Sequence, residues 1–403
     1  MNSAPPIANV VTDFDKLIST HGEGLIGRVQ KAQLKHFPPD AKKPLRSFQL
    51  SEAASYLGIS AGYLKNLSLE GKGPQPAVTS TKRRSYTAQQ MLEMRHWLDK
   101  NGRADVKKYV PHRREHEHLQ VVAVVNFKGG SGKTTTAAHL AQHLALTGHR
   151  VLAMDLDPQA SLSALCGFQP ELLRGKSLYE TLRYDKHRQP LSALVRRTNF
   201  PGLSIVPASL DLQAFEYETP IAATEEGTEQ FARRFFTRLD GALSEVVHQF
   251  DVVVLDCPPQ LGYLTLAALS SATSVLITVH PQMLDVMSMG QFLLMLAEVL
   301  EPIKGGGGNM SLDWFRYLVT RYESNDAPQA EMVDFMRRLF GRYVLQTEML
   351  KSTAISDAGI TKQTLYEVER KEMTRGTYDR AMTCLHKVNG EITSLIHQAW
   401  GRA

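Results

Sequence analysis

The pattern of hydrophobic positions changes near residue 120. From there to the end, short apolar runs alternate with longer segments of helical spacing. Strands are predicted at 121–127, 150–155, 203–207, 252–256, 275–279 and 317–320, and helices at 133–147, 229–248, 288–300, 330–340 and 377–398. Buried strands that alternate with helices indicate an α/β fold with a doubly wound, mainly parallel sheet and helices on both faces.

The preceding residues follow a different pattern. Helical spacing over 13–36 predicts one helix, although three glycines interrupt it, and the polar residues 1–12 are predicted to be disordered. Charged segments without apolar periodicity predict linkers. The predicted domains are an N-terminal helix with its linker, available for dimerisation (1–44), a small helical domain (45–100), a second linker (101–119) and the α/β domain (120–403).

Composition restricts the class of protein. The chain has 403 residues, of which 43% are hydrophobic and 22% charged, as in a soluble globular protein. No unbroken apolar run approaches the roughly 18–20 residues of a membrane span, and the first residues do not resemble a signal peptide. The three cysteines, Cys166, Cys257 and Cys384, form no paired spacing, so a reducing cytoplasm is predicted. The short apolar runs predict no membrane partner.

Charge is distributed unevenly along the chain. Residues 1–118 hold 19 Lys and Arg against 11 Asp and Glu, whereas the remainder holds 27 against 30. A basic excess in the first third favours a nucleic-acid partner, because phosphate contacts come mostly from Lys and Arg. A solvated basic face is the alternative that charge alone leaves open.

A glycine-rich segment between the first strand and its helix carries the strongest functional signal. It reads VVNFKGGSGKTTT over 124–136, which matches the P-loop form KGGxGKT and has an additional lysine, Lys128. Its glycines let backbone N–H groups point at phosphates, Lys133 bridges the β- and γ-phosphates, and the Thr134 hydroxyl binds Mg²⁺. The predicted ATP-binding set is Gly129, Gly130, Ser131, Gly132, Lys133, Thr134 and Thr135.

Acidic residues end two later strands. In doubly wound sheets the carboxyl ends of the strands face the nucleotide. Asp157, in DLDPQ at 155–159, is predicted to orient or polarise an attacking water, and Asp155 to support the metal shell. Asp256 ends an apolar strand and is predicted to hold Mg²⁺ through water. The predicted metal set is therefore Thr134, Asp256 and Asp155.

Together these segments resemble a known family. KGGSGKTT (128–135), DLDPQ (155–159) and DCPPQLGYLT (256–265) resemble the three nucleotide motifs of the ParA partition ATPases, over roughly 119–400. The resemblance implies that ATP is sandwiched between two subunits and that Lys128 reaches the partner's phosphates. It also implies catalytic roles for Lys128, Lys133 and Asp157, and slow hydrolysis stimulated by a ParB/RepB-type centromere-binding protein.

The resemblance further implies ATP-dependent, non-specific binding of nucleoid DNA by basic residues on the C-terminal face. The candidates are Arg337, Arg338, Arg342, Arg370, Lys371 and Arg375.

The segment 48–98 carries a second DNA-binding signal. Ser51 and Ser60 are predicted to cap two short helices separated by a tight turn, and a basic loop over 82–86 precedes a third helix at 88–98. This arrangement resembles the winged helix-turn-helix domain of MerR-like regulators. The predicted DNA contacts are Ser60, Tyr63, Lys65, Asn66, Arg83, Arg84 and Tyr86. A protein–protein module is the alternative.

These features favour an ATPase that segregates low-copy plasmids, represses its own operon and lies in the bacterial cytoplasm on the nucleoid. A nucleotide-responsive transcriptional repressor without a transport role is the alternative. A MinD-like membrane ATPase is excluded because residues 388–403 hold one basic residue, Arg402, and no basic amphipathic helix. The histidine-rich segment 112–118 is predicted to be a hydrated linker and not a metal site.

Overall fold

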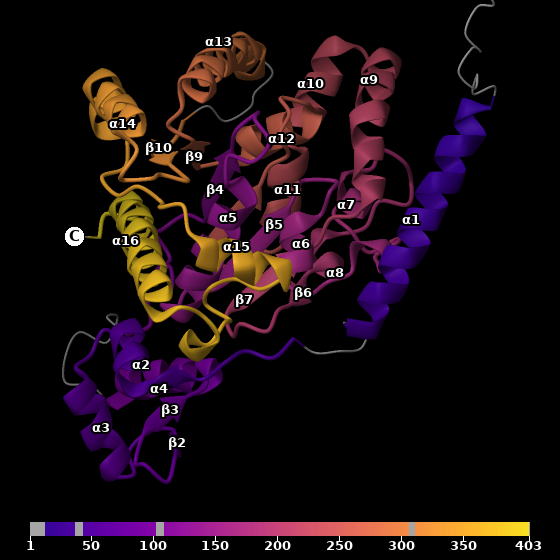
Figure 1. Cartoon of the computed structure of the whole chain (residues 1–403). Helices are drawn as coiled ribbons and strands as arrows, with labels where there is room; N and C mark the ends of the chain where they lie inside the picture. The colour runs from indigo at the N-terminus through magenta and orange to yellow at the C-terminus, as the bar shows by residue number, and fades with distance from the viewer. Residues whose placement is uncertain (1–12, 37–42, 102–108, 306–310, 403) are drawn as a thin grey trace, which may run out of the picture. The chain divides into compact units, whose positions relative to one another are not determined.

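The structure, a computed structural model, describes residues 13–36, 43–101, 109–305 and 311–402 (Figure 1). The predicted disordered start, most of the first predicted linker and part of the second lie outside these ranges. The chain forms two compact units, Met1–Lys43 and Pro44–Ala403. In the first unit, α1 (Phe14–His36) is one continuous helix as predicted, so its glycines do not break it.

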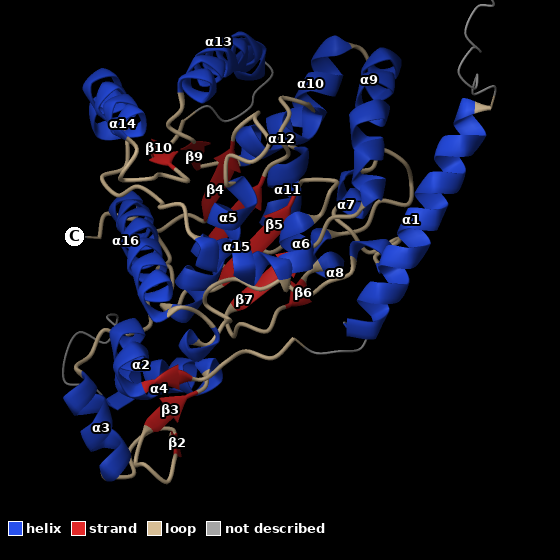
Figure 2. Ribbon diagram, viewed as in Figure 1, coloured by secondary structure: helices blue, strands red, loops and turns tan. Residues whose placement is uncertain are grey.

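The second unit is built on a seven-stranded sheet, drawn in red in Figure 2. The strand order is β10-β9-β4-β8-β5-β7-β6, and every neighbouring pair is parallel except β6 with β7. The strands are β4 (Gln120–Val125), β5 (Val151–Asp155), β6 (Arg196–Arg197), β7 (Leu203–Val206), β8 (Val252–Asp256), β9 (Ser274–Val279) and β10 (Trp314–Val319). All six predicted strands are confirmed, whereas the two-residue edge strand β6 and the three short strands of the N-terminal part were missed.

Helices cover both faces of this sheet. Alternate residues of β4 belong to different cores: Val122 and Val124 pack in one, Val121 and Val125 in the other. The doubly wound class is therefore confirmed. The helices are α5 (Lys133–Leu146), α6 (Ser161–Leu165), α7 (Tyr179–Leu182), α8 (Leu191–Leu194), α9 (Ala214–Glu226), α10 (Thr228–Phe236), α11 (Arg238–Ser244), α12 (Tyr263–Ser271), α13 (Met283–Gly305), α14 (Ala327–Phe340), α15 (Thr353–Ile360) and α16 (Arg375–Ala399).

Four of these helices differ from the prediction for identifiable reasons. The single helix predicted at 229–248 is two, α10 and α11, which meet at Thr237. The helix α12 is buried around most of its circumference, so its sequence has no helical hydrophobic period. The helix α9 was not predicted. It contains Pro220, and proline is unfavourable inside a helix because it lacks an N–H donor.

The helix α13 is unusually apolar. Over Met283–Leu300 its mean hydropathy is 1.5, so by length and composition alone it could cross a membrane. Met289 and Phe292 pack in a core of the second unit, whereas Leu284 and Met287 are exposed. The helix α13 thus packs on the core with one side, and no described residue covers the apolar side chains on its other side.

The N-terminal part of the second unit has three helices and a small antiparallel sheet. The helices are α2 (Leu50–Leu57), α3 (Ala61–Leu69) and α4 (Ala88–Asn101), and the strand order is β1-β3-β2, with β1 (Phe48–Gln49), β2 (Ala77–Val78) and β3 (Arg84–Tyr86). Ser60 caps α3 as predicted, accepting a 3.1 Å hydrogen bond from the Tyr63 N–H. The predicted Ser51 cap is wrong, because β1 runs directly into α2 and the helix begins one residue earlier, without a side-chain cap.

A buried arginine joins this three-helix part to the P-loop helix. Arg95 is 4% exposed, and no acidic side chain pairs with it among the described residues. Its guanidinium donates to main-chain carbonyls of Tyr56 in α2, of Tyr109 (2.9 Å) and of Leu146 at the end of α5 (3.3 Å). Burial lowers its pKa to about 10. Beside it, the Tyr56 ring packs on His143 of α5. The three-helix part is therefore packed on the α/β domain through its core.

The segment that follows Tyr109 is also packed, so the prediction of a hydrated linker is wrong for its described residues. The Arg113 N–H donates to Asp251 (2.9 Å), and the buried carboxylate of Glu117 pairs with Arg402 (2.6 Å). In the described part of the chain no group of three or more His, Cys, Asp or Glu is arranged to hold a metal ion.

Candidate nucleotide site

The loop between β4 and α5 has the backbone that phosphate binding requires. Gly130 (φ +76°) and Gly132 (φ +85°) adopt left-handed conformations that side chains disfavour. Thr320, after β10, donates to the Ser131 carbonyl (2.7 Å), and the Thr278 hydroxyl of β9 lies 3.0 Å from the Ser131 hydroxyl. Thr278 and Thr320, at the ends of two neighbouring strands, thus fix the conformation of the loop.

Lys133 lies at the start of α5 and is only 6% exposed. Its ammonium donates to the Lys128 carbonyl at 3.1 Å, and no ion pair to it is found within the described ranges. Burial lowers the pKa of Lys133, and Asp256 opposes this shift. A buried cation beside the positive end of a helix dipole is electrostatically unfavourable, so the site is suited to an anion.

Two carboxylates lie beside this loop. Asp155 and Asp256 are register partners on β5 and β8, and both are fully buried. Burial and the Asp155 charge raise the pKa of Asp256 well above its usual value, whereas the Thr134 hydroxyl, which is near the carboxylate but not aligned for a full hydrogen bond, lowers it. Neither Asp256 oxygen has a hydrogen-bond partner in the described residues. Such an unsatisfied carboxylate fits Mg²⁺, which takes few protein ligands and completes its shell with water and phosphate.

Asp155 differs because its own carboxylate is satisfied. It accepts hydrogen bonds from the Ser163 N–H (2.8 Å), the Ser163 hydroxyl (2.7 Å) and the Asp157 N–H (3.1 Å). The oxygens of Asp155 hold the turn that carries Asp157, and its support of the metal shell stays a prediction.

Asp157 follows β5 at the same sheet edge. It is half-buried and accepts a 2.9 Å hydrogen bond from the Gln159 N–H. Burial raises its pKa, while that hydrogen bond and Lys133 lower it. A partly desolvated carboxylate close to a cation has the character of a residue that orients water.

Lys128 is exposed but not free. Its ammonium forms an ion pair with Asp285 in the first turn of α13, and Asp285 also lies 3.2 Å from the His280 ring nitrogen. The lysine predicted to reach a partner subunit is thus held within its own chain in this conformation.

The structure adds Arg321 to the predicted residues. It follows β10 with φ +54°, a strained conformation for a residue other than glycine, and its guanidinium donates to the Gly130 carbonyl (3.1 Å). With Lys128 and Lys351 it lines a cavity of about 310 Å³ over the loop. Its position directly after a strand that ends at the nucleotide edge was the signal available in the sequence.

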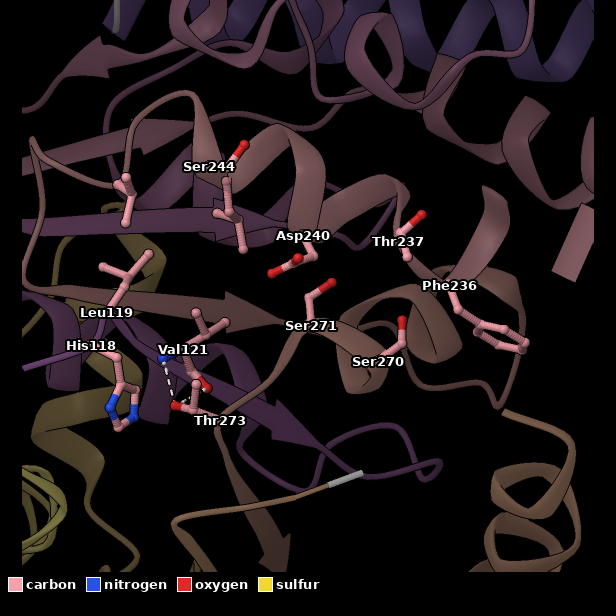
Figure 3. A pocket seen from close by; sticks show the side chains of 12 residues that line it. His118, Leu119, Val121, Phe236, Thr237, Asp240, Ser244, Ser270, Ser271 and Thr273 are labelled. Atoms are coloured by element: carbon pink, nitrogen blue, oxygen red, sulfur yellow. Dashed lines mark hydrogen bonds between the residues drawn. The ribbon is translucent and has the colours of Figure 1, made fainter. Parts of the chain in front are cut away.

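A larger cavity lies elsewhere in the unit. Figure 3 shows it, about 480 Å³ in volume, between α11, α12 and the start of β4. In that view the Thr273 hydroxyl accepts the Val121 N–H at 2.9 Å. It adjoins the amino ends of β4 and β9, and the P-loop follows the carboxyl end of β4, so this cavity is separate from the phosphate loop.

The predicted DNA contacts differ in exposure and fall into three groups. Tyr63, Lys65 and Asn66 on α3 and Arg83 on the β2–β3 hairpin are exposed, and so is Ser60, whose hydroxyl already caps α3. Arg84 is half-buried and donates to the Ser68 hydroxyl (3.2 Å). The prediction for Tyr86 is wrong: it is 0% exposed because on β3 it faces the core and pairs with Phe48 of β1.

Sequence comparison places these features among known proteins. The family described as an AAA domain matches residues 119–305. A Sinorhizobium fredii protein with the provisional name replication protein A is 60% identical over 401 residues, covering 99% of this chain and 98% of its own length. The chromosome partitioning protein ParA of Myxococcus xanthus is 32% identical over 238 residues, covering 59% of this chain and 77% of its own length.

Solved structures agree with this fold. Cobyrinic acid a,c-diamide synthase from Mycobacterium smegmatis, with bound ADP and magnesium, is 27% identical with a TM-score of 0.54, and the match covers 70% of this chain and 97% of that one. A partition protein matches 95% of this chain and 99% of its own with a TM-score of 0.59; at 16% identity, this likeness concerns the fold alone.

Proposed function

The chain belongs to the ParA family of partition ATPases, and we propose that it hydrolyses ATP to segregate a low-copy plasmid. One observation carries this proposal: a buried lysine (Lys133) without an ion pair and a buried aspartate (Asp256) without a hydrogen bond, both judged within the described residues, lie at one phosphate loop. These charges complement a nucleotide phosphate and Mg²⁺. The relatives from Myxococcus xanthus and Caulobacter vibrioides are named as chromosome partitioning proteins.

In the proposed reaction each residue near the loop has one task. The backbone N–H groups of Gly129–Thr135 and the Lys133 ammonium bind the phosphates of ATP. Thr134 and Asp256 hold Mg²⁺, which when bound neutralises charge on the phosphate oxygens. Asp157 orients the attacking water, and Asp155 fixes the Asp157 turn through the hydrogen bond from the Asp157 N–H.

We further propose that two copies enclose ATP and that Lys128 leaves Asp285 to reach the partner's phosphates. An added cation there would stabilise charge at the γ-phosphate, as an arginine finger does. The ion pair with Asp285 keeps Lys128 within its own subunit until the copies meet. A ParB/RepB-type partner would then stimulate hydrolysis and separate the copies.

The basic residues on the C-terminal face that form no ion pair among the described residues are the ones proposed to contact DNA in the dimer. Arg337, Arg370 and Lys371 each pair with an acidic side chain. Three further candidates, Arg338, Arg342 and Arg375, are exposed and form no ion pair within the described chain. These three are proposed to bind nucleoid DNA non-specifically, which would place the ATP-bound protein on the nucleoid in the cytoplasm.

The three-helix part is proposed to be a winged helix-turn-helix domain that binds operator DNA for autorepression. Exposed polar residues on α3 suit the major groove, and the β2–β3 hairpin presents Arg83 to phosphate.

Non-specific duplex binding compared between ATP and ADP tests the proposed function. With Mg²⁺, the full chain is expected to shift random-sequence DNA with ATP and not with ADP, and to hydrolyse ATP slowly. Hydrolysis without ATP-dependent DNA binding would contradict the transport role. Operator binding alone, with no hydrolysis, would support a nucleotide-responsive repressor.

Arg83 gives a separate prediction for the operator site. Arg83→Ala removes one exposed phosphate contact, so the slope of log affinity against log salt should fall by about 1. Gel shifts across a salt series measure this slope. Tyr86→Phe is the matched control, because that side chain is buried, and should leave the slope unchanged. An unchanged slope for Arg83→Ala would favour a protein–protein module.

A further inference from the structure

The segment that follows Asp256 connects β8 to α12 and is anchored at both ends. The Cys257 N–H donates to the Val124 carbonyl (3.3 Å), and the Thr265 hydroxyl donates to the Gln260 carbonyl (2.5 Å). Residues 257–262 are here called the switch loop. Because α12 holds one of its ends, the conformation of this loop depends on where α12 begins.

The start of α12 is fixed by a residue from another helix. The residue before it, Gly262, has no side chain to cap the helix. Instead the two carboxylate oxygens of Glu216, in α9, each accept one backbone N–H: Tyr263 at 2.8 Å and Leu264 at 2.9 Å. A carboxylate at this place satisfies two otherwise unpaired donors and complements the helix dipole.

Gly262 is required for this contact because of space. A Cβ atom at this position would lie 2.6 Å from both Glu216 oxygens, closer than any ordinary contact. The backbone at Gly262 is extended, so its conformation alone does not demand glycine. Glu216 and Gly262 thus form one matched pair across two helices.

The helix α9 is itself held firmly. Phe215 stacks on Tyr184 with ring centroids 5.6 Å apart, and the Tyr179 hydroxyl donates to Glu218 (2.5 Å). On the other side Tyr263 of α12 packs edge-on against Phe235 of α10 (5.7 Å). The Glu216 carboxylate is consequently presented to α12 from a rigid support.

We propose that Glu216 is a positioning residue for ATP hydrolysis, which holds the switch loop through the first turn of α12. This inference rests on the proposed function, because it assumes that the chain hydrolyses ATP. Glu216 touches neither the P-loop nor Lys133, so nucleotide affinity does not depend on it. It acts on the loop that follows Asp256 and therefore on the geometry in which the γ-phosphate and water meet.

Glu216→Gln tests the proposal, because glutamine keeps the size of the side chain but removes the charge and one acceptor. We expect kcat to fall about 10-fold, with the Kd for a fluorescent ATP analogue unchanged. Gly262→Ala should give the same result by displacing the carboxylate. The double variant should be no worse than either single variant, since both remove one contact. Glu225→Gln, exposed on the same helix, is the control.

A purely structural contact would give another result. If the Tm of Glu216→Gln falls while kcat stays at the wild-type value, or if the two single effects add in the double variant, the proposal is overturned. Absence of hydrolysis by the wild-type chain would instead contradict the proposed function, so the two failures are distinguishable.

Discussion

Asp157→Ala is expected to bind ATP normally and to hydrolyse it about 100-fold more slowly, or worse. The carboxylate lies at the nucleotide edge of the sheet, half-buried, and contributes no phosphate contact, whereas the P-loop and Lys133 remain intact. Loss of an interaction that acts on the attacking water lowers kcat without changing affinity. Single-turnover hydrolysis and equilibrium nucleotide binding together measure this difference.

The control for this variant is Asp334→Ala, which removes an exposed aspartate on α14. It should behave as wild type in both measurements. Because Asp157→Ala would trap the ATP-bound form, it should also remain on non-specific DNA after wild type has dissociated. Normal turnover by Asp157→Ala would refute the role assigned to this carboxylate.

Acidification is expected to destabilise the protein steeply below about pH 6. Burial lowers the pKa of His139 to about 4 and of His143 and His149 to about 3. In the unfolded chain the pKa of each histidine returns to about 6.5. At a pH between the folded and unfolded pKa values, the unfolded state binds more protons, so the free energy of unfolding decreases as the pH is lowered. Each histidine contributes about 1.4 kcal/mol per pH unit, and the three together about 4 kcal/mol per pH unit.

Burial keeps these rings neutral, and hydrogen bonds fix the tautomer of His139. His139 donates to the Thr135 carbonyl (2.7 Å) through one nitrogen and accepts the Leu365 N–H (3.2 Å) through the other, which leaves no place for a second proton. His149 and His397 face each other at 3.1 Å between ring nitrogens. Asp155 and Asp256 oppose the acid effect, because burial raises their pKa values and protonation relieves the pair.

Denaturant titrations from pH 7.5 to 5 measure the slope of this effect. Comparison of His143→Phe with wild type cancels the aspartate contribution, because both proteins contain the pair. The variant should lose about 1.4 kcal/mol per pH unit of the slope, whereas His187→Gln, at an exposed position, should lose none. Equal slopes for His143→Phe and wild type would contradict a neutral buried His143.

Local sequence patterns predicted the central strands and the phosphate loop. Val252–Asp256, for example, is buried on both faces and therefore reads as a continuous apolar run. Sequence patterns failed in two cases. In α12, burial on most sides removes the helical period, and on the short strand β3, the alternation of side chains between the two faces decides which residue is exposed. On β3, Tyr86 points to the core although it belongs to a basic, polar segment.

Residues that act through tertiary contacts were not predictable in the same way. Asp285 and Arg321 contact P-loop residues, and Glu216 contacts the start of α12, each from an element distant in sequence. Only the order and register of the strands bring them together. The satisfied carboxylate of Asp155 likewise depends on Ser163, eight residues away, which no spacing rule identifies.

Arg95 joins the three-helix part of the second unit to its α/β domain, because it donates to main-chain carbonyls in both. Carbonyl acceptors are independent of the side chains that carry them, so this joint tolerates substitution of its partners but not of the arginine itself. One end of α5 holds the phosphate loop, and the other end meets Arg95. A movement of α5 would therefore be transmitted through Arg95 to the three-helix part of the second unit.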